Sequence, residues 1–216
     1  MKESERGFSQ VAEESKKAKS TFREYAEAIG TALVLALFIR TFIVQAFKIP
    51  SGSMIPTLQI GDHILVNKLA YGVRVPLWGH YLLQFTTPQR GDVVVFIFPE
   101  DRTKDFIKRV IGMAGDTVEV RDKKVYVNGQ PVDDPHAYFD GDDAVGGVQI
   151  RDDYGPKRVP ENHIFVMGDN RDKSYDSRFW GFVNLDEVKG RAFLIYWSWD
   201  GSDRWVRWER LGGVIY

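Results

Sequence analysis

The stretch DFIKRVIGMAGDTVEVRDKKVYVNG, residues 105–129, decides the fold class of this chain. Apolar and polar residues alternate on both sides of a polar turn at Arg121 to Lys124. That pattern is typical of a β-hairpin. Residues 105–112 alternate in the same way, so we predict a strand followed by a hairpin.

Strand signals of this kind recur along the chain. Gly-Asp pairs at 61, 91 and 115 each precede an apolar or alternating run, namely HILVNKL, VVVFIF and TVEV. Gly and Asp are turn formers, so each pair indicates a turn followed by a strand. Two later runs, HIFVM and RAFLIYWSW, have the same character. We expect a mainly β protein in which residues 48–216 form an all-β domain.

Composition narrows the function classes. The 29 Lys and Arg residues nearly balance the 30 Asp and Glu residues, and the net charge of -1 provides no broad basic surface for nucleic acid. The absence of cysteine excludes disulfides, thiol nucleophiles and cysteine-ligated zinc. A length of 216 residues allows one membrane anchor and one domain of ordinary size.

Residues 28–47, AIGTALVLALFIRTFIVQAF, are the candidate anchor. As a helix they would span about 30 Å, the thickness of a bilayer core. Arg40 is their one charged residue, and it either snorkels to the headgroups or contacts substrate. A cleaved secretory signal would have a shorter apolar core followed by small residues, so we expect an uncleaved transmembrane helix.

Flanking charges orient this anchor. Four basic residues, Lys16, Lys17, Lys19 and Arg23, lie close before it, whereas only Lys48 occurs in residues 48–67. By the positive-inside rule, residues 1–27 are then a cytosolic segment and the chain from Lys48 onward is exported.

Two segments of the exported part are ambiguous. Residues 133–157 are rich in Asp and Gly, which predicts an exposed insertion or small subdomain rather than a calcium site, because no loop has the usual ligand spacing. The segment PLWGHYLLQF, residues 76–85, is either core or a membrane-interfacial loop. The side chains that would face the membrane are Trp78, Leu82, Leu83 and Phe85.

The stretch FKIPSGSMIPTL, residues 47–58, leads out of the predicted anchor. Pro50 and Pro56 restrict the backbone on both sides, while Gly52 permits a tight turn. Such a segment suits Ser53 as a nucleophile close to the membrane surface, although an ordinary turn has the same signature.

A serine nucleophile needs a base, and none of the four histidines is an obvious one. Alternation in residues 105–112 places Lys108 on the same strand face as Phe106 and Val110. Burial there would lower the lysine pKa and make its amine a base, as in Ser-Lys proteases. A lone lysine in a strand can equally be an edge residue.

GDNRDKSYDSRFWG, residues 168–181, is a third polar patch, after the apolar run IFVM. Its polar side chains could orient a catalytic group. The interleaved Arg171, Lys173 and Arg178 favour ion pairs over a metal site, and Asp176 with Arg178 is the expected pair. We expect no metal.

Four stretches together resemble the successive motifs of bacterial type I signal peptidases, the leader peptidases with a Ser/Lys dyad: FKIPSGSMIPTL, GDHILVNKLAYG, RGDVVVF with IKRVIGMAGD, and GDNRDKSYDSRFWGFV. The resemblance covers roughly residues 28–200. It implies antiparallel, barrel-like sheets with a small inserted subdomain. It also implies a serine endopeptidase anchored in the bacterial plasma membrane, without a cofactor. The family includes one-span and two-span members, and this sequence shows one span. We expect a monomer.

The resemblance assigns roles residue by residue. Ser53 matches the nucleophile and Lys108 the general base. The Ser51 hydroxyl and the Ser53 amide match the oxyanion hole, and Ser174 matches the serine that orients the lysine. A supporting ion pair falls on Asp176 and Arg178.

The implied substrates are exported preproteins whose signal peptides end in small residues at the first and third positions before the cut, as in Ala-x-Ala. Shallow apolar pockets would explain that preference. By the same resemblance, their lining is Phe47, Ile49, Met54, Leu58, Ile64, Phe106 and Ile107. Lys173 departs from the pattern, because many members have Asn there.

Three alternatives stay open. Self-cleaving repressor proteases share the Ser/Lys chemistry, but a DNA-binding segment would be expected in place of the anchor. A dedicated maturation peptidase of the same superfamily would process one substrate. A membrane-anchored β-module without activity is the third.

Overall fold

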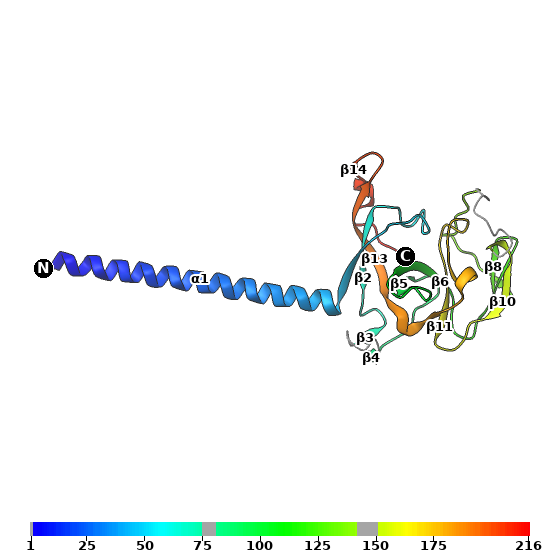
Figure 1. Ribbon diagram of the computed structural model, residues 1–216, viewed down its shortest axis with the longest axis horizontal. Helices are drawn as coiled ribbons and strands as arrows, with labels where there is room; N and C mark the ends of the chain where they lie inside the picture. The colour runs from blue at the N-terminus through cyan, green and yellow to red at the C-terminus, as the bar shows by residue number, and fades with distance from the viewer. Residues whose placement is uncertain (1, 75–80, 142–150) are drawn as a thin grey trace. The chain divides into compact units, whose positions relative to one another are not determined.

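The computed structural model describes residues 2–74, 81–141 and 151–216 (Figure 1). The chain divides into two compact units, Met1–Thr41 and Phe42–Tyr216. The first unit is helical, and its helix α1 covers Lys2–Phe42. Within α1, the segment Thr21–Phe42 is long and apolar enough to cross a membrane.

The prediction that the anchor extends over residues 28–47 is wrong at its C-terminal end. The helix ends at Phe42, and Val44–Lys48 form β1, which pairs antiparallel with β2 (Asp62–Asn67). Hydropathy did not reveal this boundary, because the apolar β-branched run TFIV suits a membrane helix and a strand equally well. Pairing with β2 supplies the backbone partners that favour the strand.

Antiparallel strands build the second unit, and this confirms the predicted mainly β fold (Figure 1). Within the described chain, the largest sheet has the strand order β1-β2-β13-β5-β6-β11-β12, with β14 paired to β13. Its remaining strands are β5 (Val93–Ile97), β6 (Asp105–Gly112), β11 (His163–Met167), β12 (Val183–Asn184), β13 (Val188–Asp200) and β14 (Trp205–Val206).

The predicted hairpin is confirmed in a second sheet, of order β10-β7-β8-β9. Its strands are β7 (Thr117–Arg121), β8 (Lys124–Val127), β9 (Gln130–Pro131) and β10 (Tyr154–Arg158). Asp122 and Lys123 form the turn with φ angles of 48° and 67°. A two-residue turn with positive φ at both positions matches the right-handed twist of the flanking strands.

The two ambiguous segments have mixed outcomes. Residues 142–150 of the predicted insertion lie outside the described residues, and its last residues belong to strand β10, which is exposed after Tyr154. In the other segment, β3 (Gly72–Arg74) pairs with β4 (Tyr81–Gln84). Leu82, Leu83 and Phe85 are exposed, so they are not core residues, while Trp78 lies outside the described residues.

Three apolar clusters form the core. The first lies around β2, β5 and β13, the second includes Phe96 and Val110, and the third joins the smaller sheet to β6 and β11 through Ile111 and Phe165. Short helical turns complete the described fold: α3 (Ser177–Trp180), η1 (Leu185–Glu187) and η2 (Trp208–Arg210).

Candidate active site

Ser53 and Lys108 meet in this fold. Lys108 Nζ lies 2.7 Å from Ser53 Oγ. Both residues are buried, with 8% of Ser53 and 4% of Lys108 exposed. This distance is within hydrogen-bond reach for proton transfer between a nucleophile and its base.

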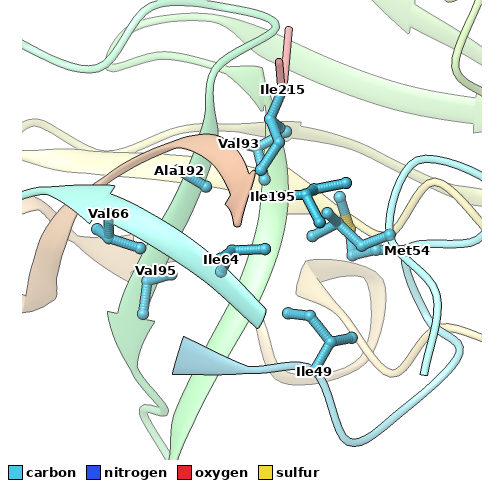
Figure 2. Packing of buried hydrophobic residues seen from close by; sticks show 10 residues of the cluster. Ile49, Met54, Ile64, Val66, Val93, Val95, Ala192, Ile195 and Ile215 are labelled. Atoms are coloured by element: carbon cyan, nitrogen blue, oxygen red, sulfur yellow. The ribbon is translucent and has the colours of Figure 1, made fainter. Parts of the chain in front are cut away.

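Apolar packing holds the Ser53 segment on the domain. Met54 and Leu58 are fully buried in the first cluster, and the amide of Leu58 donates to the Met54 carbonyl at 2.8 Å. Figure 2 shows Met54 gathered with Ile49 and Ile64 in this cluster. The Ser53 side chain is therefore presented by a turn whose next residue is anchored in the core.

A strand of the large sheet presents Lys108. Lys108 lies opposite Val94 of β5, and its Nζ is 5.4 Å from the centre of the Phe106 ring. Burial lowers the pKa of Lys108 from 10.5 to about 8. The Asp176 and Asp169 carboxylates act in the opposite direction, and the Arg178 guanidinium acts with burial. A fraction of Lys108 therefore carries a neutral amine near neutral pH.

Asp176 and Arg178 form a buried bidentate ion pair. Arg178 Nε donates to Asp176 Oδ1 at 2.9 Å, and the second pair of atoms, Nη2 and Oδ2, is also 2.9 Å apart. Burial alone would raise the pKa of Asp176, but the Arg178 charge and hydrogen bonds, including one from the Gly168 amide, lower it overall. Asp176 therefore stays ionised near Lys108.

Ser174 is buried in the same loop, next to Gly168. Its hydroxyl has no hydrogen-bond partner of good geometry among the described residues. It nevertheless lies close enough to Asp176 to help lower the pKa of that carboxyl. The structure thus brings Ser174 into the site without a hydrogen bond to Lys108.

Sequence reasoning missed a second buried ion pair. Arg109 Nη2 donates to Asp169 Oδ2 at 2.7 Å and Arg109 Nε donates to Asp169 Oδ1 at 2.8 Å. Thr57 Oγ1 also donates to Asp169, at 2.6 Å. The pair links β6 to the Gly168 loop and to the nucleophile segment. A second charged side chain beside Lys108 in β6 was the only signal for it.

The predicted oxyanion and pocket residues have different environments. Ser51 is exposed. The seven predicted pocket residues divide between two clusters. Ile49, Met54, Leu58 and Ile64 are buried in the first cluster, Phe47 and Ile107 pack against it, and Phe106 packs against the second.

No metal site accompanies this arrangement in the described residues, since they contain no group of three or more His, Cys, Asp or Glu side chains able to hold an ion. A buried hydroxyl beside a lysine of lowered pKa, with ion pairs around it, is instead suited to nucleophilic catalysis.

Comparisons with known proteins identify the family of this chain. The family model described as "Signal peptidase, peptidase S26" matches residues 22–197. A signal peptidase I of Pseudomonas fluorescens is 38% identical in an alignment 206 positions long, gaps included, and the match covers 82% of this chain and 72% of that protein. A probable signal peptidase I-2 of Synechocystis is 41% identical in an alignment 202 positions long, and the match covers 87% of this chain and 80% of that protein. A crystal structure of a signal peptidase I from Enterococcus faecalis matches 50% of this chain and 98% of its own at 33% identity, with a TM-score of 0.42.

Proposed function

Because the chain belongs to the signal peptidase family of S26 peptidases, we propose that it removes signal peptides from exported preproteins with a Ser53/Lys108 dyad. The 2.7 Å approach of Lys108 Nζ to Ser53 Oγ carries this proposal. The lowered pKa of Lys108, about 8, supports it, because only the neutral amine can accept a proton.

The proposed reaction is acyl transfer. Neutral Lys108 accepts the proton of Ser53, and Ser53 Oγ attacks the scissile carbonyl. The Ser51 hydroxyl and the Ser53 amide donate to the resulting oxyanion. Protonated Lys108 then gives its proton to the leaving amine, and as a neutral base again it activates the water that hydrolyses the ester.

The edge of β6 supports binding of the signal peptide as an added strand. β6 pairs with β5 from Asp105 to Arg109, but β11 covers its other side only over Arg109–Gly112. Among the described residues, no strand pairs with the second side of Asp105–Lys108. An extended peptide there would gain main-chain hydrogen bonds beside the dyad.

Specificity for small residues would come from the apolar side chains around Ser53. Four of the seven proposed lining residues are already fully packed in the core. Such pockets are shallow because their floors cannot move without opening cavities. Cleavage after an Ala-x-Ala-like motif follows from this proposal.

Membrane anchoring completes the proposal. The segment Thr21–Phe42 would cross the bacterial plasma membrane once, with Lys16, Lys17 and Lys19 before it on the cytoplasmic side. Residues 48–216 would then lie on the outer or periplasmic side as the catalytic domain. The proposed partners are preproteins and lipid, and we propose that the enzyme acts as a monomer.

Product analysis tests the proposal directly. The detergent-solubilised full chain is incubated with a preprotein whose signal peptide ends in Ala-x-Ala, and the products are identified by mass spectrometry. We expect one cut after that motif with wild type and none with Ser53→Ala or Lys108→Ala. Lys104→Met, at a surface lysine, is the matched control and should cleave normally.

Each other outcome has a defined meaning. Cleavage by Ser53→Ala would show that Ser53 is not the nucleophile. If wild type does not cut this preprotein but an acylating inhibitor labels Ser53, the enzyme is a dedicated maturation peptidase. Absence of both cleavage and labelling would indicate a β-module without activity.

A further inference from the structure

The segment Asp134–Gly141, which we call the strap, lies against the Gly168–Lys173 loop of the active site. Tyr138 makes the central contact: its amide donates to the Asp169 carbonyl, and its carbonyl accepts from the Arg171 amide, each at 2.8 Å. These two bonds bracket Asn170 in a parallel bridge. One strap residue thereby fixes the backbone on both sides of Asn170.

Asn170 connects this bridge to the nucleophile. Its amide donates to the carbonyl of Ser53 at 3.1 Å. Strap, loop and nucleophile segment therefore lie side by side, joined by backbone hydrogen bonds. A displacement of the strap would move Asn170, and with it the backbone that presents the Ser53 hydroxyl.

Asp134 fastens the end of the strap to the same loop. Its carboxylate accepts from Arg171 Nη2, and both side chains are shielded from solvent, with 9% and 3% exposed respectively. Arg171 Nε also donates to the Gly168 carbonyl at 3.2 Å. The second carboxylate oxygen of Asp134 accepts from the His136 amide at 3.0 Å, which shapes the turn leading to Tyr138.

Polar contacts are the main attachment at this end of the strap. Hollows of about 310 and 400 Å³ adjoin this end of the strap, and Asp134 lines both. Packed side chains therefore do not fill the space beside the Asp134–Arg171 pair. At the far end, Lys173 Nζ pairs with Asp140 at 2.6 Å, and the Gly141 amide donates to Asp172 at 3.2 Å.

We propose that Asp134 is a positioning residue for the peptidase reaction: through Arg171 it holds the loop whose Asn170 amide fixes Ser53. This inference rests on the proposed function, and it assigns a role to the first part of the Asp-rich insertion. Asp134 does not contact the reacting atoms. It acts on the rate of Ser53 acylation and not on the binding of the signal peptide.

The test compares Asp134→Asn with Asp133→Asn in the detergent-solubilised full chain. Asp133 is exposed and undergoes the same loss of charge one position away. Two rates are measured: kcat for the Ala-x-Ala preprotein, and the rate at which a small acylating inhibitor labels Ser53. KM for the preprotein is determined together with kcat. The thermal unfolding midpoint is recorded for each variant.

We expect Asp134→Asn to lower kcat and the labelling rate together by roughly tenfold or more, because a misplacement of about 1 Å can cost 10²-fold. KM should stay within about twofold of wild type, and Asp133→Asn should match wild type in both rates. A folded Asp134→Asn protein that is labelled at the wild-type rate overturns the proposal.

Asp134→Glu covers the case in which Asp134→Asn does not fold. It keeps the charge but lengthens the side chain by one methylene, so the pair can form only if the loop shifts. We expect a smaller fall in the labelling rate and faster amide exchange at Asn170. Wild-type values for both would overturn the proposal. If wild type itself is not labelled at Ser53, the proposed function fails instead.

Discussion

Lys108 Nζ and Ser53 Oγ, 55 positions apart in the chain, lie 2.7 Å apart beneath the surface of the domain. The same burial that brings them together lowers the pKa of the lysine, since a charged ammonium is poorly solvated there. Burial therefore accounts both for the position of Lys108 next to Ser53 and for its tendency to lose a proton.

Peptidase activity should rise with pH along a limb centred near pH 8. With a Lys108 pKa of about 8, about one tenth of the lysine is neutral at pH 7 and most of it at pH 9. The measurement is kcat/KM for a signal-peptide substrate from pH 6 to 10. An activity that is flat over this range would contradict the assignment of Lys108 as the base.

Asp176→Asn should move this limb to lower pH. The Asp176 carboxylate raises the pKa of Lys108, whereas the Arg178 charge, which would lose its partner, lowers it. Removing one member of a buried pair should also cost about 3–5 kcal/mol of unfolding free energy. Asp140→Asn, in the partly exposed pair with Lys173, is the control and should leave the limb in place. A limb that moves to higher pH would refute this account.

Lys108→Met should abolish cleavage but stabilise the fold at pH 7. The folded pKa of Lys108 is lower than the unfolded value of 10.5, so the unfolded chain binds more protons between about pH 8 and 10.5. Wild-type stability therefore rises with pH across that window, and below it the buried lysine costs up to about 3 kcal/mol. Methionine removes this cost while keeping a similar volume.

Denaturant titrations at pH 7 and pH 10 measure the effect of Lys108→Met. We expect a gain of about 1–3 kcal/mol at pH 7 that shrinks at pH 10. Lys104→Met, whose side chain is 64% exposed, should change stability by less than about 0.5 kcal/mol. A loss of stability at pH 7 for Lys108→Met would mean that other contacts of the lysine outweigh its desolvation.

Gly168→Ala should inactivate the enzyme. An added Cβ at this position would lie 2.4 Å from the Ser53 carbonyl oxygen and 2.3 Å from Ser174 Oγ, so the nucleophile backbone must shift. We expect kcat to fall by about 10²-fold. Gly201→Ala, where a Cβ meets nothing within 4 Å, is the control and should retain full activity. Normal activity of a folded Gly168→Ala protein would show that this close approach is unimportant.

Local sequence patterns predicted the apolar helix and seven strands of the described fold, namely β2, β5, β6, β7, β8, β11 and β13. The β7–β8 hairpin and the strands after each Gly-Asp pair follow from alternation and turn chemistry, which are properties of neighbouring residues. The end of α1 did not follow, because the residues after Phe42 suit a helix or a strand, and their pairing with β2 decides between them. The pairing partners are distant in the chain, and composition does not identify them.

In the candidate site, too, the sequence indicated single residues but not the contacts between distant segments. Residue types and spacing made Ser53 and Lys108 candidates, but an ordinary turn and an edge lysine were equally consistent with the sequence. The Arg109–Asp169 pair and the strap at Asp134 were not predicted at all. Both join segments that are distant in the chain, so alternation within one strand says nothing about them.

The sequence by itself therefore determined the strongly alternating or apolar strands, the apolar N-terminal helix and the residues that can do the chemistry. Only the tertiary structure decided which of those residues meet. It buried Lys108 against Ser53, enclosed Asp176 with Arg178, and placed Asn170 on the carbonyl of Ser53. The physical reason is that strand propensity acts between neighbours, whereas desolvation and hydrogen bonding at the site depend on segments that only folding brings together.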